Sequence, residues 1–379
     1  MKPLPLFVPP EERFDCHRCG ACCRGPEGVA VSGADLVRLE GWDWSTEGPR
    51  FADGPSVTRL DEATGEFTTR LRQRPDGACI FLDSDGLCLV EKRLGHEAKP
   101  LRCRLFPLRF TEWPDGERSV SVSPRCRSLH RSFERGSPVG VEKPVPVGAI
   151  GKEELGDLLE EAPIVVLTGE SFLLAPGRPL SWPECRVLLE DLVSAANMEE
   201  PLEALPWRVM RAIRRIYPDP PPPFPYEGPP DTPLFEALLV AGEFLAPVAR
   251  DSGRRLLAAG LEELRRYGAW RRTARSLEPQ AARFCRTAFR SFVREGLPLR
   301  YPDLVGGAGY VLVLALSIAA AAARLGEVRR AGSKGNANEA NEVAREASFF
   351  AEDPVPRPVV AGLREAFARV VFDAAPPGR

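Results

Sequence analysis

The stretch FDCHRCGACCRG (Phe14–Gly25) places four cysteines within eight residues, at Cys16, Cys19, Cys22 and Cys23. Thiols three residues apart on a turn-rich loop can converge on one centre, as they do in the ligand runs of iron–sulfur proteins. Cys22 and Cys23 are direct neighbours, and adjacent side chains usually diverge. If one thiol of the pair serves a first site, the other is therefore free to serve a second.

Further cysteines follow downstream, so the first third of the chain is rich in thiols. Eight of the ten cysteines in this 379-residue chain lie within residues 16–126, the later four being Cys79, Cys88, Cys103 and Cys126. An even, clustered set of thiols in a cytosolic chain indicates metal ligation rather than disulfides. The other two, Cys185 and Cys285, fall in helical patterns and are predicted to be buried small apolar groups.

The composition limits the cell compartment and the partners. The opening residues, MKPLPLFVPPEERF, are broken by four prolines and lack the apolar core of a secretory signal, which predicts a cytoplasmic protein. A net charge of −2 predicts no strong attraction to nucleic acid or to an anionic membrane. With 44% apolar and 27% charged residues, the chain has an ordinary globular composition.

The spacing of the thiols leaves the metal open. Eight thiols make two four-ligand sites, or one site and four cysteines in other roles, and both zinc and a 4Fe–4S cluster take four ligands. One compact cluster followed by single cysteines slightly favours an iron–sulfur cluster over zinc. His17 could replace a cysteine as ligand, although an exposed bystander is the favoured interpretation, and His96 and His130 have no supporting spacing.

Basic residues accompany the later cysteines. Between Lys99 and Arg135 there are nine Lys or Arg residues against four Asp or Glu residues. Arginines flank two of the thiols: Arg102 and Arg104 around Cys103, and Arg125 and Arg127 around Cys126. They could stabilise the negative charge of a thiolate-ligated metal, and a solvated basic surface explains them equally well.

The pattern predicts a mostly α protein with a small, irregular α+β, cysteine-rich, metal-binding N-terminal domain and a C-terminal helical bundle. The predicted parts are the cysteine-rich domain (1–145), a helical segment (146–217), a proline-rich connector (218–233) and the bundle (234–379). The small core of the cysteine-rich domain needs additional stabilisation, and a bound metal commonly provides it. Nine prolines within residues 217–233 exclude a helix there.

Helical periodicity dominates the second half. SWPE (Ser181–Glu184) has the form of a capping box, and it predicts a helix that ends near residue 196. Further helices are predicted over residues 202–216, 252–268, 278–295, 310–328 and 357–373, with a loop at GSKGNANEAN (Gly332–Asn341). Leu304–Ala323 carries no charge and is long enough to span a bilayer, but its glycines and alanines favour a buried bundle helix.

Three spaced elements carry a family resemblance: CHRCGACC, then GACIFLDSDGLCLVEKRLGHEAKPLRCRLFPLRF (Gly77–Phe110), then PRCR (Pro124–Arg127). In this order they resemble the YkgJ-type CxxCxxCC cysteine-cluster family over about residues 14–130. The resemblance implies a zinc- or iron-chelating domain. Related flagellin lysine N-methylases bind a 4Fe–4S cluster and use S-adenosylmethionine, which raises the expectation of iron.

Two classes of function follow. In the first, the chain is a metal-binding or docking module that meets a protein partner, holding an iron–sulfur cluster or, alternatively, a structural zinc ion. In the second, it is an S-adenosylmethionine-dependent protein-lysine N-methyltransferase acting on a protein substrate, with catalytic residues that the sequence does not name. The sequence has no GxGxxG, no P-loop and no HExxH, and its three histidines make a histidine-based triad improbable.

Overall fold

The computed structural model describes the chain in segments, and every structural statement below refers to them. They are residues 6–10, 12–24, 28–61, 66–132, 136–140, 164–167, 172–175, 177–197, 202–216, 245–251, 253–264, 277–301, 303–329 and 337–350. The predicted connector (218–233) and the predicted helix over 357–373 lie outside these residues.

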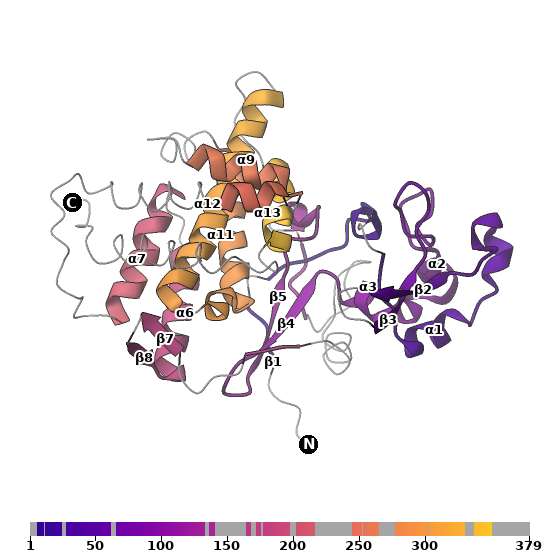
Figure 1. Cartoon of the computed structure of the whole chain (residues 1–379), viewed down its shortest axis with the longest axis horizontal. Helices are drawn as coiled ribbons and strands as arrows, with labels where there is room; N and C mark the ends of the chain where they lie inside the picture. Colours follow the sequence, from indigo (N-terminus) through magenta and orange to yellow (C-terminus); the bar gives the residue numbers. More distant parts are fainter. Residues whose placement is uncertain are drawn as a thin grey trace. The chain divides into compact units, whose positions relative to one another are not determined.

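The chain forms two compact units that are interleaved in sequence. Unit 1 comprises Met1–Pro9, Phe110–Arg125 and Ile164–Arg379, and unit 2 comprises Pro10–Arg109 and Cys126–Pro163. Unit 1 is mostly helical and unit 2 is a mixed α+β structure with short elements (Figure 1). The predicted fold class is confirmed.

Unit 2 is assembled from short helices and one hairpin around a small core. Its elements are η1 (Ala21–Arg24), α1 (Gly33–Leu39), η2 (Trp44–Glu47), η3 (Pro49–Phe51), β2 (Ser56–Asp61), β3 (Glu66–Leu71), α2 (Leu89–Leu94), η4 (His96–Ala98), α3 (Leu101–Leu105) and η5 (Leu129–Arg131). Strands β2 and β3 pair antiparallel, with Leu60 opposite Phe67. Helix α1 begins with a complete capping box, in which the side chains of Ser32 and Asp35 each accept from the other's backbone N–H.

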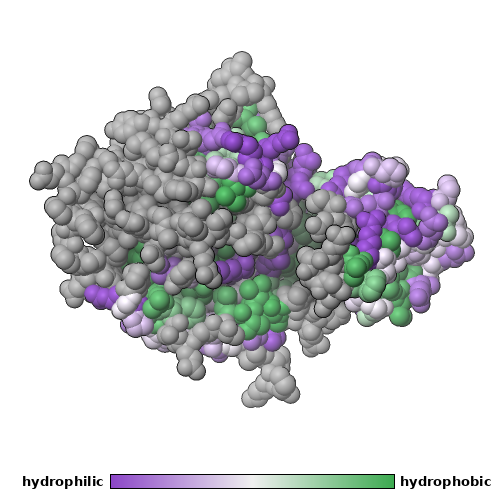
Figure 2. All heavy atoms as spheres, in the orientation of Figure 1, coloured by the Kyte–Doolittle hydropathy of each residue, from purple (hydrophilic) through white to green (hydrophobic). Residues whose placement is uncertain are grey.

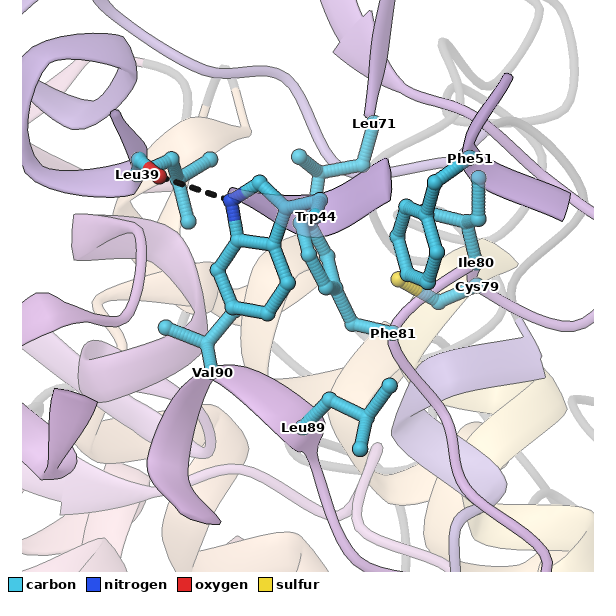
Figure 3. Packing of buried hydrophobic residues seen from close by; sticks show 9 residues of the cluster. All are labelled: Leu39, Trp44, Phe51, Leu71, Cys79, Ile80, Phe81, Leu89 and Val90. Atoms are coloured by element: carbon cyan, nitrogen blue, oxygen red, sulfur yellow. Dashed lines mark hydrogen bonds between the residues drawn. The ribbon is translucent and has the colours of Figure 1, made fainter. Parts of the chain in front are cut away.

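The core of unit 2 is aromatic and contains one of the thiols. Trp44, Phe51 and Phe81 pack with ring centroids 4.7–5.9 Å apart, and the Trp44 indole N–H donates to the Leu39 carbonyl at 2.7 Å (Figure 3). Cys79 belongs to the same buried cluster, which also includes Leu71, Ile80, Leu89 and Val90. Because unit 2 is small, this cluster is a large part of what holds it together.

A four-stranded sheet in unit 1 has the order β1-β5-β4-β6. Its strands are β1 (Leu6–Phe7), β4 (Leu108–Glu112), β5 (Arg118–Val122) and β6 (Val165–Val166), and β1 and β6 pair parallel to β5 and β4. Strand β5 has the sequence RSVSV. A second pair, β7 (Phe172–Ala175) and β8 (Arg178–Leu180), is antiparallel.

The helices of unit 1 follow the sequence periodicity closely. They are α6 (Trp182–Asn197), η6 (Leu202–Ala204), α7 (Leu205–Ile216), α9 (Arg255–Leu264), α11 (Pro279–Arg294), η7 (Leu297–Arg300), α12 (Leu304–Arg329) and α13 (Ala337–Phe350). At the start of α6 the Glu184 carboxylate accepts from the Ser181 N–H at 2.8 Å, as the capping pattern predicts. Cys185 and Cys285 are fully buried, which confirms their predicted structural role.

Helix α12 is the central helix of unit 1. Residues 304–323 have the length and apolar composition of a membrane span, and all of them are buried inside the structure, where α12 packs with α9, α11 and α13 (Figure 1). The helix begins six residues earlier than predicted. Gly307 lies directly against the Pro298 backbone, so this glycine permits close packing and does not interrupt the helix.

Helix α13 corrects a second expectation. Residues 337–341 were predicted to belong to a loop because of their asparagines and the preceding glycines, yet they form the first turn of α13. Glu339, Ala340 and Asn341 are buried there, and the Asn341 amide donates to the Pro124 carbonyl at 3.4 Å. Tertiary contacts therefore override the weak local helix preference of these residues.

Candidate metal centre

The amino-terminal thiols lie on an irregular segment that is fastened at its start. The Phe14 N–H donates to the Ser137 carbonyl at 2.9 Å, and the Asp15 carboxylate accepts from the Ser137 N–H at 3.1 Å. After Cys16 the chain turns through Gly20, which has a positive φ of 65°, into the short helix η1. Cys16, Cys19 and Cys22 are exposed on this segment, whereas Cys23 is partly buried.

Backbone pairing brings the second pair of cysteines to the first cluster. The Cys79 N–H donates to the Cys23 carbonyl at 2.6 Å, and bridges join Gln73 with Cys79 and Leu82 with Cys88. Cys22, Cys23 and Cys79 also line one small pocket, together with Gly28, Val29, Leu71 and Gln73. The loop with Cys79 and Cys88 therefore lies beside the amino-terminal cluster.

Cys88 occupies the N-cap position of α2. Burial raises the pKa of its thiol, while hydrogen bonds from the backbone N–H groups of Glu91 and Val90 and the charge of Lys99 lower it. The free N–H groups of a helix start stabilise a negative charge, so this position suits a thiolate ligand.

Cys103 lies on α3, and the start of that helix is fixed by a distant carboxylate. The buried Asp35 accepts from the Leu101 N–H at 2.8 Å and from the Arg38 guanidinium at 2.6 Å. Asp35 thereby ties α1 to the helix that carries Cys103.

Cys126 joins the cluster through a shared hydroxyl. The Ser128 Oγ lies 3.6 Å from the Cys19 sulfur and 3.6 Å from the Cys126 sulfur. Cys126 and Ser128 are both buried. Two thiols more than a hundred residues apart in sequence therefore meet at one side chain.

Unit 2 thus contains all eight cysteines that the sequence nominates, while Cys185 and Cys285 belong to unit 1. All ten thiols are free, with no disulfide among them. The His17 ring lies 3.1 Å from the Ser132 hydroxyl and next to Arg131, and burial and this guanidinium lower its pKa.

The thiols influence one another electrostatically. Burial raises the pKa of Cys79 to about 12, and the nearby Cys88 and Cys22 contribute to the rise. Burial likewise raises the pKa of Cys126 to about 11, with contributions from Cys19 and Cys22. Such thiols are protonated at neutral pH until a cation replaces the proton.

Lys99 provides positive charge within the thiol group. Its ammonium lies 3.0 Å from the Glu91 carboxylate, and its charge acts on Cys16, Cys22, Cys88 and Cys103. The flanking Arg104 instead pairs with Glu97 and donates to the Lys99 carbonyl at 3.2 Å. In the sequence, Lys99 was noted only as part of a basic stretch, and the roles of Ser128 and Asp35 were not predicted.

The donor set suits a metal, but the described residues do not form a finished coordination shell. No three His, Cys, Asp or Glu side chains among them are grouped so that they could hold one ion. Free thiols of this number, with a lysine and helix N–H groups beside them, have the chemistry that zinc and iron–sulfur clusters require. We therefore expect the thiols to close around the metal as it binds.

A small unit that gathers eight free thiols has the form of a thiol-rich, metal-chelating domain. Residues 15–126 match the CxxCxxCC family model, described as "Putative zinc- or iron-chelating domain". The resemblance stated from the sequence is confirmed over this stretch. The family description names metal chelation and not methyl transfer, so the methyltransferase alternative stays a prediction.

One curated relative is similar to a part of the chain. An uncharacterized protein of Methanocaldococcus jannaschii is 24% identical over 121 residues, which make up 31% of this chain and 37% of the relative. The match therefore spans little more than a third of that relative's length. No solved structure matches this chain.

Proposed function

We propose that this protein is a metal-binding module that holds a 4Fe–4S cluster through its N-terminal cysteines and acts in the reducing cytoplasm. The observation that carries the proposal is the presence of eight free thiols in unit 2, where Cys79 pairs with Cys23 and Ser128 lies between Cys19 and Cys126. The match to a zinc- or iron-chelating domain supports it.

The chemistry of the surroundings agrees with this role. A 4Fe–4S cluster held by four thiolates carries net negative charge, which the Lys99 ammonium and the N–H groups at the start of α2 would stabilise. Cys79 is buried against the aromatic core, and burial from solvent is one of the factors that set cluster potentials. The bound cluster would supply either a structural cross-link or a one-electron carrier.

The identity of the bound metal distinguishes an iron–sulfur cluster from a zinc ion, so the test is an elemental analysis. The full-length protein should be purified under nitrogen and analysed for iron, acid-labile sulfide and zinc. We expect a brown protein with iron and sulfide in equal amounts. A colourless protein with stoichiometric zinc would replace the cluster with the zinc alternative, and a protein with neither metal would refute chelation altogether.

A further inference from the structure

The neighbouring thiols of Cys22 and Cys23 lie in contact with each other. Their sulfur atoms are 3.9 Å apart, although the side chains of adjacent residues were expected to diverge. The hydrogen bond between the two thiols is the largest cause of the raised pKa of Cys22. Both side chains also line one cavity of about 80 Å³, together with Cys79. The pair therefore acts as a unit, and the expectation that the two thiols separate is corrected.

The surroundings of the pair leave it accessible. Cys22 is exposed, whereas Cys23 is partly buried. The backbone of Cys23 is held by two hydrogen bonds, because its N–H donates to the Gly20 carbonyl at 3.2 Å and its carbonyl accepts from the Cys79 N–H at 2.6 Å. A reagent in solution can thus reach one thiol, and the cavity gives both side chains room to turn toward each other.

The covalent geometry of adjacent cysteines makes a bond between them labile. The Cα atoms of neighbouring residues are about 3.8 Å apart, which is less than the lower limit of about 4.4 Å that is usual for disulfides. A disulfide between Cys22 and Cys23 is therefore strained, and strained disulfides are easily reduced. Such a bond forms and breaks reversibly and is not a permanent cross-link.

We propose that Cys22 and Cys23 are the site of a reversible disulfide, formed by exchange with a small-molecule disulfide when the protein is free of metal. One cysteine attacks the reagent as a thiolate, so that a mixed disulfide forms and one reagent thiol leaves. The other cysteine attacks the mixed disulfide and releases the second reagent thiol. Two protein thiols are oxidised, one reagent disulfide is reduced, and the two thiol protons pass to the released thiols.

The consequence of this disulfide for the protein rests on the proposed metal binding. A disulfide engages both sulfurs, and thiolates that bind a metal are not free to attack a reagent, so the bond and the metal exclude each other. The oxidised protein has lost two of its eight candidate ligands. Metal uptake therefore depends on the balance of thiols and disulfides around the protein.

Peptide mass analysis tests the proposal. Metal-free, reduced full-length protein is incubated with oxidised glutathione at mildly alkaline pH, treated with N-ethylmaleimide and digested with trypsin. Cleavage after Arg18 and Arg24 releases the peptide CGACCR. We expect this peptide to lack two hydrogens and to carry one maleimide, located on Cys19 by fragmentation. Three maleimides, a retained glutathione, a maleimide on either later cysteine or a link to another peptide would each overturn the proposal.

Three variants identify the thiols that react. Cys19→Ser should still form the bond, whereas Cys23→Ser should form none within this peptide and should carry two maleimides. Cys285→Ser, whose thiol is buried in unit 1, is the control and should behave like the parent. A disulfide that forms equally in Cys23→Ser would show that other thiols are oxidised. A parent bond that resists reduced glutathione would contradict its reversibility.

Metal-loaded protein separates this inference from the proposed function. Zinc-loaded protein is incubated with oxidised glutathione in the same way, and its thiols are then treated with maleimide in denaturant and chelator. We expect three maleimides on the same peptide. Equal disulfide formation with and without bound zinc would overturn the exclusion and leave metal binding intact. A protein that binds neither iron nor zinc would instead refute the proposed function.

Discussion

Ser128 contacts two thiols without being a ligand candidate itself, which makes it the residue through which Cys19 and Cys126 are oriented. We expect Ser128→Ala to weaken metal binding by about 10- to 100-fold, as loss of a residue that orients ligands typically does. Competition with a chromophoric chelator measures this affinity. Ser84→Ala, at an exposed position, is the matched control. Equal affinities for the two variants would show that the hydroxyl is a bystander.

Asp35 fixes the start of α3 through hydrogen bonds that only a carboxylate can accept together. Its side chain accepts from the N–H groups of Ser32 and Leu101, from the Ser32 hydroxyl and from Arg38. In Asp35→Asn the amide N–H₂ would face one set of these donors, and we expect the free energy of unfolding to fall by about 2 kcal/mol. Urea denaturation of the full-length protein at neutral pH measures the loss, and an unchanged midpoint would contradict it.

The effect of Asp35 depends on pH in a defined direction. Burial alone raises the pKa of this carboxyl, but the hydrogen bonds from Ser32, Leu101 and Arg38 lower it more, so the pKa lies below its ordinary value of 3.8. The stabilisation is therefore complete above pH 3.8 and is lost as the pH falls through the folded-state pKa. The difference between Asp35→Asn and the parent should shrink over that acidic range, and a difference independent of pH would contradict this origin.

The spacing of the cysteines identified the candidate thiols, but it could not predict the residues that position them. Ser128 meets Cys19 across 109 residues and Asp35 meets Leu101 across 66. Neither contact leaves a local pattern in the sequence, since serine and aspartate at these positions are common in turns and caps. The family pattern likewise names cysteines and is silent about Lys99.

At the scale of helices and strands, local patterns were reliable where capping and periodicity agreed. The SWPE motif placed the start of α6, and the apolar steps after Leu202 placed α7. Composition misled where packing decides the backbone, as in the glycines at the start of α12 and the asparagines of α13. The helix was predicted to begin only after these glycines, and the asparagines were predicted to lie in a loop. In the structure Gly307 packs against the Pro298 backbone, and Asn341 donates to the Pro124 carbonyl.

The close contact between α12 and η7 predicts that adding a single methyl group at Gly307 destabilises the protein. A side chain at Gly307 would collide with the backbone carbonyl of Pro298, which cannot rotate away as a side chain can. We expect Gly307→Ala to lower the free energy of unfolding by about 1–3 kcal/mol. Gly33→Ala is the control, because open space surrounds this helical position and the change should stabilise by about 0.4–1 kcal/mol. Far-ultraviolet circular dichroism during urea denaturation compares the two, and equal midpoints would contradict the contact.

Exposed apolar side chains occur in both units. They include Phe7, Val37, Leu60, Phe67 and Val166, and Figure 2 shows apolar and hydrophilic residues side by side on one face of the described part of the chain. Phe67 and Leu60 face each other across the β2–β3 hairpin. Single exposed apolar residues of this kind are normal on protein surfaces.

For the whole molecule, the two units should respond differently to loss of metal. Unit 2 has a small core and contains the thiols proposed to bind metal, whereas unit 1 is built around the buried helix α12. A chelator added to the metal-loaded protein should therefore speed amide hydrogen exchange in α1, α2 and α3 and leave α11 and α12 unchanged. The matched control is the same protein incubated without chelator. Uniform acceleration in both units, or none in unit 2, would contradict this division.

The interleaving of the units has a practical consequence for anyone who wishes to isolate the thiol-rich part. The β4–β5 hairpin leaves unit 2 after Arg109 and returns at Cys126, and its carbonyl at Val122 accepts from the Ser291 hydroxyl on α11. A fragment that ends near residue 145 would contain the hairpin without helix α11, which packs against it. Val120 and Val122 would then be exposed to water. Replacing residues 110–125 by a short linker, instead of truncating, is the sounder way to excise a self-standing version.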